Sequence, residues 1–321
     1  MVAKKILITG AAGFIGSHLC ERMIDTGYSV VGADNFSDFY AREAKLANLA
    51  AGLSDEPSFQ FVEADIRDQR AVQDVISSHR PKAIIHLAAM AGVRPSIEDP
   101  SLYADVNVNG TVHLLDAAVA NGVEKFVFAS SSSVYGNNRK VPFTEEDPVD
   151  FPISPYAATK RAGELLCHSY WHLHQLPIAC LRFFTVYGPR QRPDLAIAKF
   201  FRLIEQGKTI ELYGDGTTSR DYTYIDDIID GVCAAFDRID RFRIYNLGGN
   251  HPVTLKELIA GVEETMQRKA NIVQKPMQPG DVDHTFADLT RSNDELDYRP
   301  KTSLLEGLMN QWQWRQNQPM Q

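Results

Sequence analysis

A glycine-rich turn near the N-terminus limits what this chain can fold into more than any other stretch. Residues 10–16 read Gly-Ala-Ala-Gly-Phe-Ile-Gly and follow a short apolar run at 5–9. That run has the length and the branched side chains of a buried parallel strand. Apolar residues then recur at helical spacing until Gly27, which predicts a helix that ends there. Such a turn brings backbone N–H groups close to a pyrophosphate at the positive end of a helix, so we predict a dinucleotide site.

An acidic residue at the end of the next predicted strand supports this interpretation. Residues 28–34 form that strand, and Asp34 closes it 24 residues after Gly10 (34 − 10). A carboxylate at about this distance accepts hydrogen bonds from the adenosine ribose hydroxyls, which favours NAD over NADP. The alternative is a tight turn that binds no ligand, although the strand, the helix and the acid all stand in register. The residues predicted to contact NAD here are Gly10, Gly13, Phe14, Ile15, Gly16 and Asp34.

Composition excludes several other classes of protein. The 321 residues suffice for one large domain or two unequal ones, and the net charge of −8 argues against a nucleic-acid backbone as the main partner. No apolar run approaches the roughly 20 residues that span a bilayer, and the glycine turn interrupts the first run, so we expect no export signal. The cysteines show no Cys-x-x-Cys spacing and no disulfide pattern, so we expect reduced thiols in a cytoplasmic protein: Cys20, Cys167, Cys180 and Cys233.

Further strands alternate with helices along the first half of the chain. Strands are predicted at 59–65, 83–89 and 125–130, and a helix at about 100–121. This alternation predicts an α/β fold with a Rossmann-type, doubly wound parallel sheet, in which ligands lie beyond the carboxyl ends of the strands.

Three groups of residues at these predicted strands bear on the cofactor site. Asp65 and Ile66 flank an adenine ring in one interpretation, and in the other Asp65 caps a helix. His86 lies within a strand, so a hydrogen-bonded core histidine is favoured over a catalytic one. The small residues that end this strand allow a close approach to the cofactor: Leu87, Ala88 and Ala89.

A polar segment follows the strand at 125–130. Four serines at 130–133 are by themselves most often a polar loop. A helix is predicted from Pro155, a residue type that suits the first helical position, to about residue 174. Tyr156 and Lys160 are four residues apart and share one face of that helix. The pair is common by chance, but it stands 25 residues after Ser131 (156 − 131), downstream of a dinucleotide turn.

Together these motifs resemble the extended short-chain dehydrogenase/reductases, the superfamily of nucleotide-sugar epimerases and dehydratases, over nearly the whole chain. The resemblance implies an NAD that stays bound and a Tyr156 that acts as base. It also implies that Lys160 lowers the pKa of Tyr156 and binds ribose, and that Ser131 hydrogen-bonds the reacting hydroxyl. Elementary chemistry agrees, because a tyrosine with a pKa near 10 needs an adjacent cation to act as a base.

Two differences from other members of the superfamily indicate which of its branches this chain resembles. Dehydratases and UDP-glucuronate decarboxylases carry an acid directly after the active-site Ser or Thr, whereas this chain has Ser132 and Ser133, predicted to contact substrate. Residues 181–194 resemble the UDP-glucuronate 4-epimerases, with Thr185 where UDP-galactose 4-epimerases usually have asparagine. Arg192 is the candidate for binding a substrate carboxylate, because a guanidinium forms two parallel hydrogen bonds with one. The alternative for Arg192 is a solvated loop residue.

The second half of the chain resembles the substrate domain of the same superfamily. Arg220 is expected at the UDP diphosphate and Asp281 at the uridine ribose, while Arg94 is either a further substrate contact or a surface residue. A Thr254 and Glu257 pair predicts a capping box. We expect an NAD-binding domain at 1–185, with a return to it near 226–250, and a smaller α/β domain at 186–321 that mainly binds UDP-sugar. The resemblance also implies a homodimer through the helices at 100–121 and 156–174, and no metal is expected.

The sequence therefore predicts NAD-dependent 4-epimerisation of UDP-glucuronate to UDP-galacturonate through a 4-keto sugar, with Tyr156 as base. The nearest alternative is a UDP-glucose or UDP-N-acetylglucosamine 4-epimerase. A UDP-glucuronate decarboxylase is disfavoured by Ser132 and Ser133. A non-catalytic NAD-binding protein is disfavoured because Tyr156 and Lys160 are both present.

Overall fold

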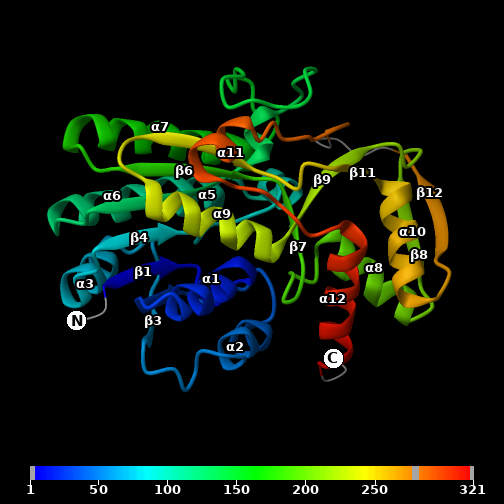
Figure 1. Cartoon of the computed structure of the whole chain (residues 1–321), viewed down its shortest axis with the longest axis horizontal. Helices are drawn as coiled ribbons and strands as arrows, with labels where there is room; N and C mark the ends of the chain where they lie inside the picture. Colours follow the sequence, from blue (N-terminus) through cyan, green and yellow to red (C-terminus); the bar gives the residue numbers. More distant parts are fainter. Residues whose placement is uncertain (1–3, 277–281, 319–321) are drawn as a thin grey trace.

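A parallel seven-stranded sheet forms the centre of the molecule in the computed structural model, which describes residues 4–276 and 282–318 (Figure 1). Within these residues the strand order is β10-β6-β5-β4-β1-β2-β3. The strands are β1 (Lys5–Thr9), β2 (Ser29–Asp34), β3 (Phe59–Glu63), β4 (Ala83–His86), β5 (Lys125–Ser131), β6 (Ile178–Phe183) and β10 (Arg243–Leu247). This topology confirms the predicted Rossmann-type α/β class.

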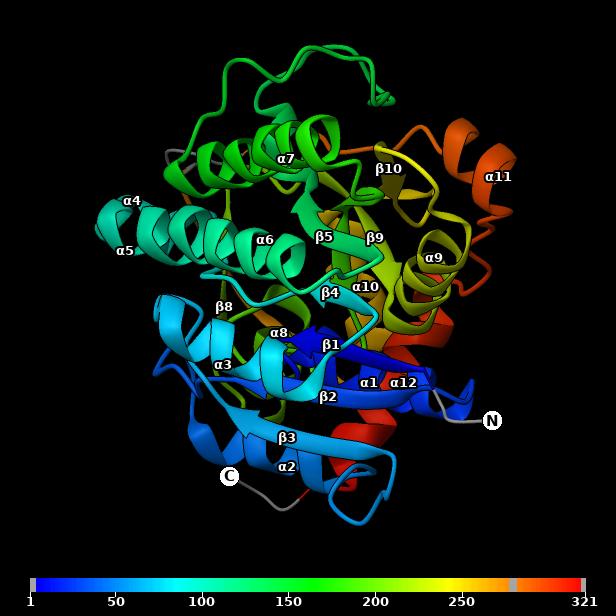
Figure 2. The same ribbon diagram turned by 90° about the vertical axis from the view of Figure 1, so that its left-hand side faces the viewer.

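Helices cover both faces of this sheet, as Figure 2 shows. Side chains alternate along β1, so Ile6 and Ile8 join the core beneath one helical layer, whereas Leu7 joins the core beneath the other. The first layer contains α1 (Phe14–Asp25), α2 (Arg42–Ala50), α9 (Ile225–Arg238) and α11 (Thr290–Leu296). The second contains α3 (Gln69–His79), α6 (Gly110–Ala120) and α7 (Pro155–His174). The inner strands are therefore buried on both faces, as a parallel sheet requires, whereas the edge strand β3 is partly exposed.

The helix predicted at 100–121 contains a π-helical turn. It begins as α5 (Pro100–Ala104), passes through a π segment at Asp105–Asn109 and continues as α6. The π segment carries Asn107, whose side chain bonds both backbone groups of Met90 and, at 3.0 Å, the Thr159 hydroxyl. This one side chain therefore fixes the loop after β4 against α7, and π turns of this kind are frequent beside functional sites.

Two strands end earlier than the sequence predicts. β3 ends at Glu63 rather than at residue 65, and β4 ends at His86 rather than at residue 89. β4 lies between β1 and β5, and its pairing with β1 stops at Thr9, where the chain turns at Gly10. Leu87, Ala88 and Ala89 therefore lie in a loop beyond the end of the ladder.

A smaller part of the molecule stands beyond one end of the sheet (Figure 1). Its strands are β7 (Thr185–Tyr187), β8 (Thr209–Tyr213), β9 (Ser219–Tyr224), β11 (Pro252–Thr254) and β12 (Asn271–Lys275). In the described residues these form a three-stranded β11-β9-β7 sheet and a parallel β12-β8 pair. Its helices are α8 (Ala196–Glu205), α10 (Leu255–Met266) and α12 (Leu304–Gln316). The capping box predicted at the start of α10 is confirmed, with Thr254 and Glu257 each bonding the other's backbone.

Candidate active site

The glycine turn has the shape that a pyrophosphate requires. Gly10 adopts a φ of 73°, and a Cβ on it would lie 2.9 Å from the backbone nitrogen of Ala88. A Cβ on Gly16 would lie 2.0 Å from the carbonyl oxygen of Gly10, so a side chain there would displace α1. No side chain caps the start of α1 at Gly13, which leaves the positive helix end to an anion. The residues of this turn therefore fit a dinucleotide.

Asp34 is fixed beside this turn. One of its carboxylate oxygens accepts from the Ala12 backbone nitrogen at 3.2 Å, and the other accepts from that of Phe36 at 2.9 Å. Burial raises the pKa of Asp34 above its usual value. A carboxylate has about four acceptor positions. The acceptor positions that the backbone leaves open can receive a ribose hydroxyl of an NAD.

The loop after β3 carries Asp65, for which the sequence leaves two roles open, helix capping and contact with adenine. The helix cap is Asp68, which accepts from the first backbone nitrogens of α3, so capping by Asp65 is the wrong alternative. Asp65 instead bonds Arg67 and Asn35, and the Arg67 side chain is the main reason that its pKa falls to about 2. Ile66 is buried against Gly110 of α6. Contact of Asp65 and Ile66 with adenine stays a prediction.

The loop after β4 lies against the glycine turn. The backbone nitrogens of Leu87 and Ala88 bond the carbonyl and the hydroxyl of Thr9, each at 3.2 Å. His86 is buried between the hydroxyls of Thr9 and Thr111, at 2.8 and 3.0 Å. Burial lowers the pKa of His86 to about 3, so its imidazole is neutral. The prediction of a hydrogen-bonded core histidine is confirmed.

Ser131 and Tyr156 meet at the carboxyl end of β5. The Ser131 hydroxyl is close enough to the Tyr156 phenol to lower its pKa by hydrogen bonding, and Ser133 donates a hydrogen bond to the Ser131 hydroxyl at 2.9 Å. Burial raises the pKa of Tyr156, while the bond with Ser131 and the positive charge of Arg192 oppose that rise. The Tyr103 ring packs edge-on against Tyr156, at 6.2 Å between centroids. The phenol is thus oriented by one hydroxyl and influenced by one guanidinium.

Lys160 lies one turn further along α7 and is 4% exposed. Its ammonium donates to the Ala129 carbonyl at 2.8 Å and lies 6.0 Å from the centroid of the Tyr156 ring. Burial lowers the pKa of Lys160 to about 8. The cation that lowers the Tyr156 pKa in this structure is Arg192, so the corresponding role of Lys160 stays a prediction, as does its ribose contact.

A buried ion pair supports the serine segment from below. Arg182 of β6 donates from Nε and Nη2 to both carboxylate oxygens of Glu164, at 2.8 and 2.9 Å. The Ser130 hydroxyl donates to the same carboxylate at 2.6 Å. The arginine and glutamate side chains are 1% and 0% exposed. This cluster ties α7, which carries Tyr156, to β5 and β6 directly before Ser131.

Arg192 lies over the same site. Its Nε and Nη2 donate to the two carboxylate oxygens of Asp194 at 3.0 and 2.8 Å. The guanidinium carbon lies 4.7 Å from the centroid of the Phe39 ring, and Nη2 lies 3.9 Å from the point that a Cβ on Gly92 would occupy. The side chain is 16% exposed, which excludes the solvated loop residue of the sequence alternative. Its charge acts on the pKa of Tyr156, so the guanidinium lies within electrostatic range of the phenol.

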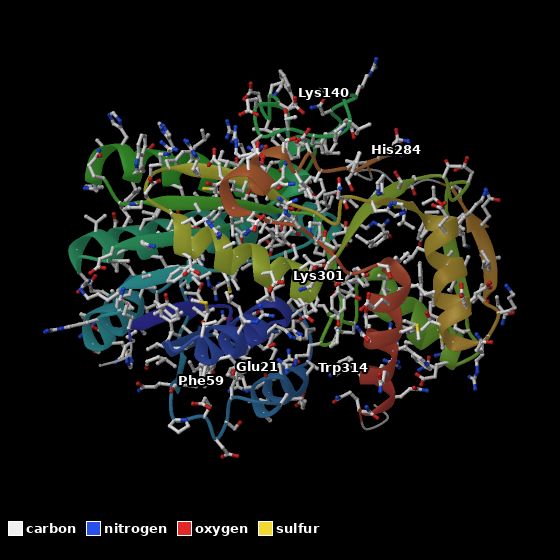
Figure 3. The ribbon with its side chains drawn as sticks, in the orientation of Figure 1. Glu21, Phe59, Lys140, His284, Lys301 and Trp314 are labelled. Carbon is white, nitrogen blue, oxygen red and sulfur yellow. The ribbon has the colours of Figure 1, made fainter. Side chains whose placement is uncertain are left out.

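The segment before Arg192 is attached to the glycine-turn helix. The carbonyl of Pro189 bonds the His18 ring at 3.0 Å, and Arg190 donates to Glu21 at 2.8 Å. Figure 3 labels Glu21 beside α1. Burial, assisted by the Arg190 charge, lowers the pKa of His18 to about 4. The helix that would receive the cofactor thus also positions Arg192.

The remaining predicted contacts are distributed around this centre. Arg94 of α4 (Val93–Glu98) has its guanidinium 5.3 Å from the Tyr213 ring, which joins the sheet side to the smaller part. Arg220 bonds the carbonyls of Ser219 and Asp283, at 2.9 and 3.4 Å.

Four further predicted residues complete the set. Thr185 opens β7, and Ser132 and Ser133 form the short 3₁₀ turn at Ser132–Tyr135. Asp281 lies outside the described residues. The roles of these residues stay predictions.

Three residues of the candidate site were not predicted from the sequence. Asp194 ends the stretch that resembles the epimerases, and only its spacing of two from Arg192 could have indicated the pair. Phe39 lies in a polar insert after β2, where a lone aromatic residue carries no signal. Glu164 lies one turn beyond Lys160, so the sequence could have predicted that the two residues share a face of α7.

Residues 4–276 and 282–318 contain neither a candidate metal site nor a candidate membrane-spanning helix. No group of three or more His, Cys, Asp or Glu side chains there is arranged to hold a metal ion. No helix in this part of the chain combines the length and apolar character needed to cross a membrane.

Comparison with known proteins places the chain in a family. The model of the GDP-mannose 4,6 dehydratase family matches residues 7–311. A UDP-glucuronate 4-epimerase from Thermodesulfobacterium geofontis is 40% identical, over 96% of this chain and 95% of its own. The Bacillus cereus UDP-glucuronic acid 4-epimerase, solved with UDP-glucuronic acid and NAD, superposes with a TM-score of 0.91 at 37% identity, covering 97% and 99% of the two chains. A Thermotoga maritima UDP-glucose 4-epimerase gives 0.87 at 33% identity, covering 97% and 98%.

The chain therefore belongs to the GDP-mannose 4,6 dehydratase family, among the nucleotide-sugar epimerases of the extended short-chain dehydrogenase/reductases. This confirms the resemblance drawn from the glycine turn and from Tyr156 and Lys160.

Proposed function

We propose that this protein is an NAD-dependent epimerase that interconverts UDP-glucuronate and UDP-galacturonate at C4. The observation that carries the proposal is the position of Arg192, a guanidinium only 16% exposed that lies within electrostatic range of Tyr156. Its two parallel donors match a carboxylate. The UDP-glucuronate 4-epimerases among its relatives support the same substrate.

Tyr156 and Ser131 would handle the proton of the 4-hydroxyl. The Tyr156 phenolate accepts that proton, and the Ser131 hydroxyl holds the substrate oxygen in line with it. The glycine turn and Asp34 would hold NAD, which would supply the hydride acceptor and donor that reaction at C4 needs. The Arg192 charge stabilises the phenolate, because it opposes the effect of burial on the Tyr156 pKa.

The carboxylate creates a chemical hazard that the site must control. A sugar with a keto group at C4 and a carboxylate on C5 is a β-keto acid, which loses carbon dioxide when the C5–carboxylate bond aligns with the carbonyl π system. Arg192 and Thr185 keep that bond out of alignment while the sugar turns to present its other face. They must hold the carboxylate and release it, and such control of orientation can contribute several kcal/mol.

The domain roles and the assembly are part of the proposal. The sheet and its helices at 1–185 bind NAD, with α9 and β10 returning to them, and 186–321 mainly binds the UDP-sugar through Arg220 and Asp281. The protein is a homodimer through α5–α6 and α7, which is supported by Leu165 and Leu173 of α7, 53% and 71% exposed. The four free cysteines support a cytoplasmic location.

A UDP-glucose 4-epimerase is the second candidate, favoured by the Thermotoga maritima neighbour. It uses the same Tyr156 and Ser131 and differs in what surrounds C5. The nearly buried Arg192 would then have no substrate carboxylate to bind.

One incubation tests the proposal. Purified protein is mixed with UDP-glucuronate without added cofactor, and the products are followed by NMR. UDP-galacturonate is expected, because the proposal includes an NAD that stays bound through purification. A UDP-pentose would mean that the carboxylate is not protected, and no product at all would move the proposal to UDP-glucose.

A further inference from the structure

Arg192 is already occupied by a carboxylate of this chain. Asp194 receives two parallel hydrogen bonds from Nε and Nη2 of Arg192, at 3.0 and 2.8 Å. This is the bidentate geometry in which a guanidinium binds a ligand carboxylate. A substrate carboxylate that approaches the same two donors must therefore compete with Asp194.

The surroundings of Arg192 allow this exchange without moving the guanidinium. The Phe39 ring lies 4.7 Å from the guanidinium carbon, and Nη2 lies against Gly92. Arg192 is 16% exposed, whereas the Asp194 side chain is 46% exposed. The arginine is thus held by its neighbours, while the aspartate can rotate into solvent at little cost.

We propose that Asp194 is a specificity-determining residue that occupies Arg192 in the absence of substrate and exchanges it with the carboxylate of the UDP-sugar. The proposal rests on the proposed function, because it assigns the exchange partner as a uronate. It explains how one arginine can both hold and release the sugar: when the carboxylate leaves Arg192 as the ring turns, Asp194 takes its place. The guanidinium is never left unpaired in a largely buried position, which would be costly.

If Asp194 and the substrate carboxylate exchange at Arg192, removing the Asp194 charge should strengthen the binding of UDP-glucuronate. Without Asp194 as competitor, UDP-glucuronate should bind about fivefold more tightly, which is the most that a half-exposed ion pair contributes. The release that permits rotation should become slower, so kcat on UDP-glucuronate should fall while KM also falls. UDP-glucose has no carboxylate, so its binding should not change.

The experiment compares the dissociation constants of UDP-glucuronate and UDP-glucose by isothermal titration calorimetry, on NAD-loaded protein. The variants are Asp194→Asn, Asp194→Glu and the matched control Asp297→Asn. Asp297 pairs with Arg299, also two residues away, at 2.9 Å in the exposed connection between α11 and α12. The ratio of the two constants should shift about fivefold toward UDP-glucuronate in Asp194→Asn, and remain at the wild-type value in the other two. Asp194 is half-exposed, and a melting curve verifies that each variant folds.

The outcomes separate this inference from the proposed function. An unchanged ratio in Asp194→Asn, or an equal shift for both sugars, overturns the role of Asp194 even if NMR shows UDP-galacturonate. A shifted ratio supports that role even if no UDP-galacturonate forms, in which case the epimerase proposal alone fails. Failure of UDP-glucuronate to bind wild-type protein overturns both.

Discussion

Two arginine–carboxylate pairs of this protein have the same bidentate geometry and opposite surroundings. Arg182 and Glu164 are sealed beneath the serine segment, at 1% and 0% exposure. Arg192 and Asp194 lie beside the substrate space, at 16% and 46%. Glu164 also binds Ser130 and Arg161 of this chain, and burial closes the first pair to a ligand, so it acts as a support. Partial exposure of Asp194 leaves the second pair exchangeable, so the same chemistry can recognise a ligand.

The largest effect should come from breaking the buried pair. Glu164→Ala leaves the Arg182 charge buried and the Ser130 hydroxyl without its partner, which should lower the free energy of unfolding by about 3–5 kcal/mol. Urea unfolding measures the change. If the loss is no greater than that of Asp194→Ala, measured in parallel, burial does not distinguish the two pairs.

Lys160 is a buried cation that can be compared with the two arginines. Its hydrogen-bond acceptor is a backbone carbonyl rather than a carboxylate. Its folded pKa of about 8 lies below the ordinary 10.5, so the unfolded chain binds more protons between these values. Raising the pH from 8 to 10.5 should therefore stabilise wild type relative to Lys160→Met, by up to about 3 kcal/mol. Below pH 8 the difference should be constant.

Urea unfolding at pH 7.5 and pH 10, at matched NAD content, measures this difference. A difference between the two proteins that does not vary with pH would show that Lys160 is not held in a desolvating site.

Arg192→Ala should affect chemistry rather than folding. We expect kcat/KM on UDP-glucuronate to fall about 100-fold, since a bidentate charged contact is lost, and NAD content and unfolding to stay near wild type. Steady-state kinetics, with bound NAD measured by absorbance after denaturation, checks this. Equal losses on UDP-glucuronate and UDP-glucose would mean that Arg192 does not recognise the carboxylate.

The smallest effect is expected at the exposed pair of Asp297 and Arg299, 71% and 69% exposed. Asp297→Asn should leave melting temperature and kinetics unchanged, because solvent screens such pairs. A clear loss of activity there would indicate that changes in charge act at long range, and would weaken the interpretation of Asp194→Asn.

Local patterns in the sequence predicted much of the fold and part of the candidate site. Some motifs involve residues that are close in sequence, so they can be recognised without the structure. These are the glycine turn, the acidic residue Asp34 at the end of the second strand, and the pair of Tyr156 and Lys160 one helical turn apart. The alternation of strands and helices likewise predicted the sheet, because parallel strands are apolar on both faces.

The environment of Arg192 could not be predicted in this way. Phe39 follows β2, Gly92 follows β4 and Arg192 follows β7, and they meet only because β2, β1 and β4 are neighbours in the sheet. The exchange partner Asp194 is close in sequence, yet only the folded loop shows that it occupies the guanidinium. The strand ends at Glu63 and His86 were also missed, because they depend on where the partner strands stop.

The central claim is that a partly exposed arginine pair makes this epimerase selective for a uronate. Offering the wild-type protein equal amounts of UDP-glucuronate and UDP-glucose in one NMR tube tests it directly. The account predicts that UDP-glucuronate is epimerised at least about tenfold faster, as a charged bidentate contact requires. Equal rates for the two sugars, or faster conversion of UDP-glucose, would contradict it.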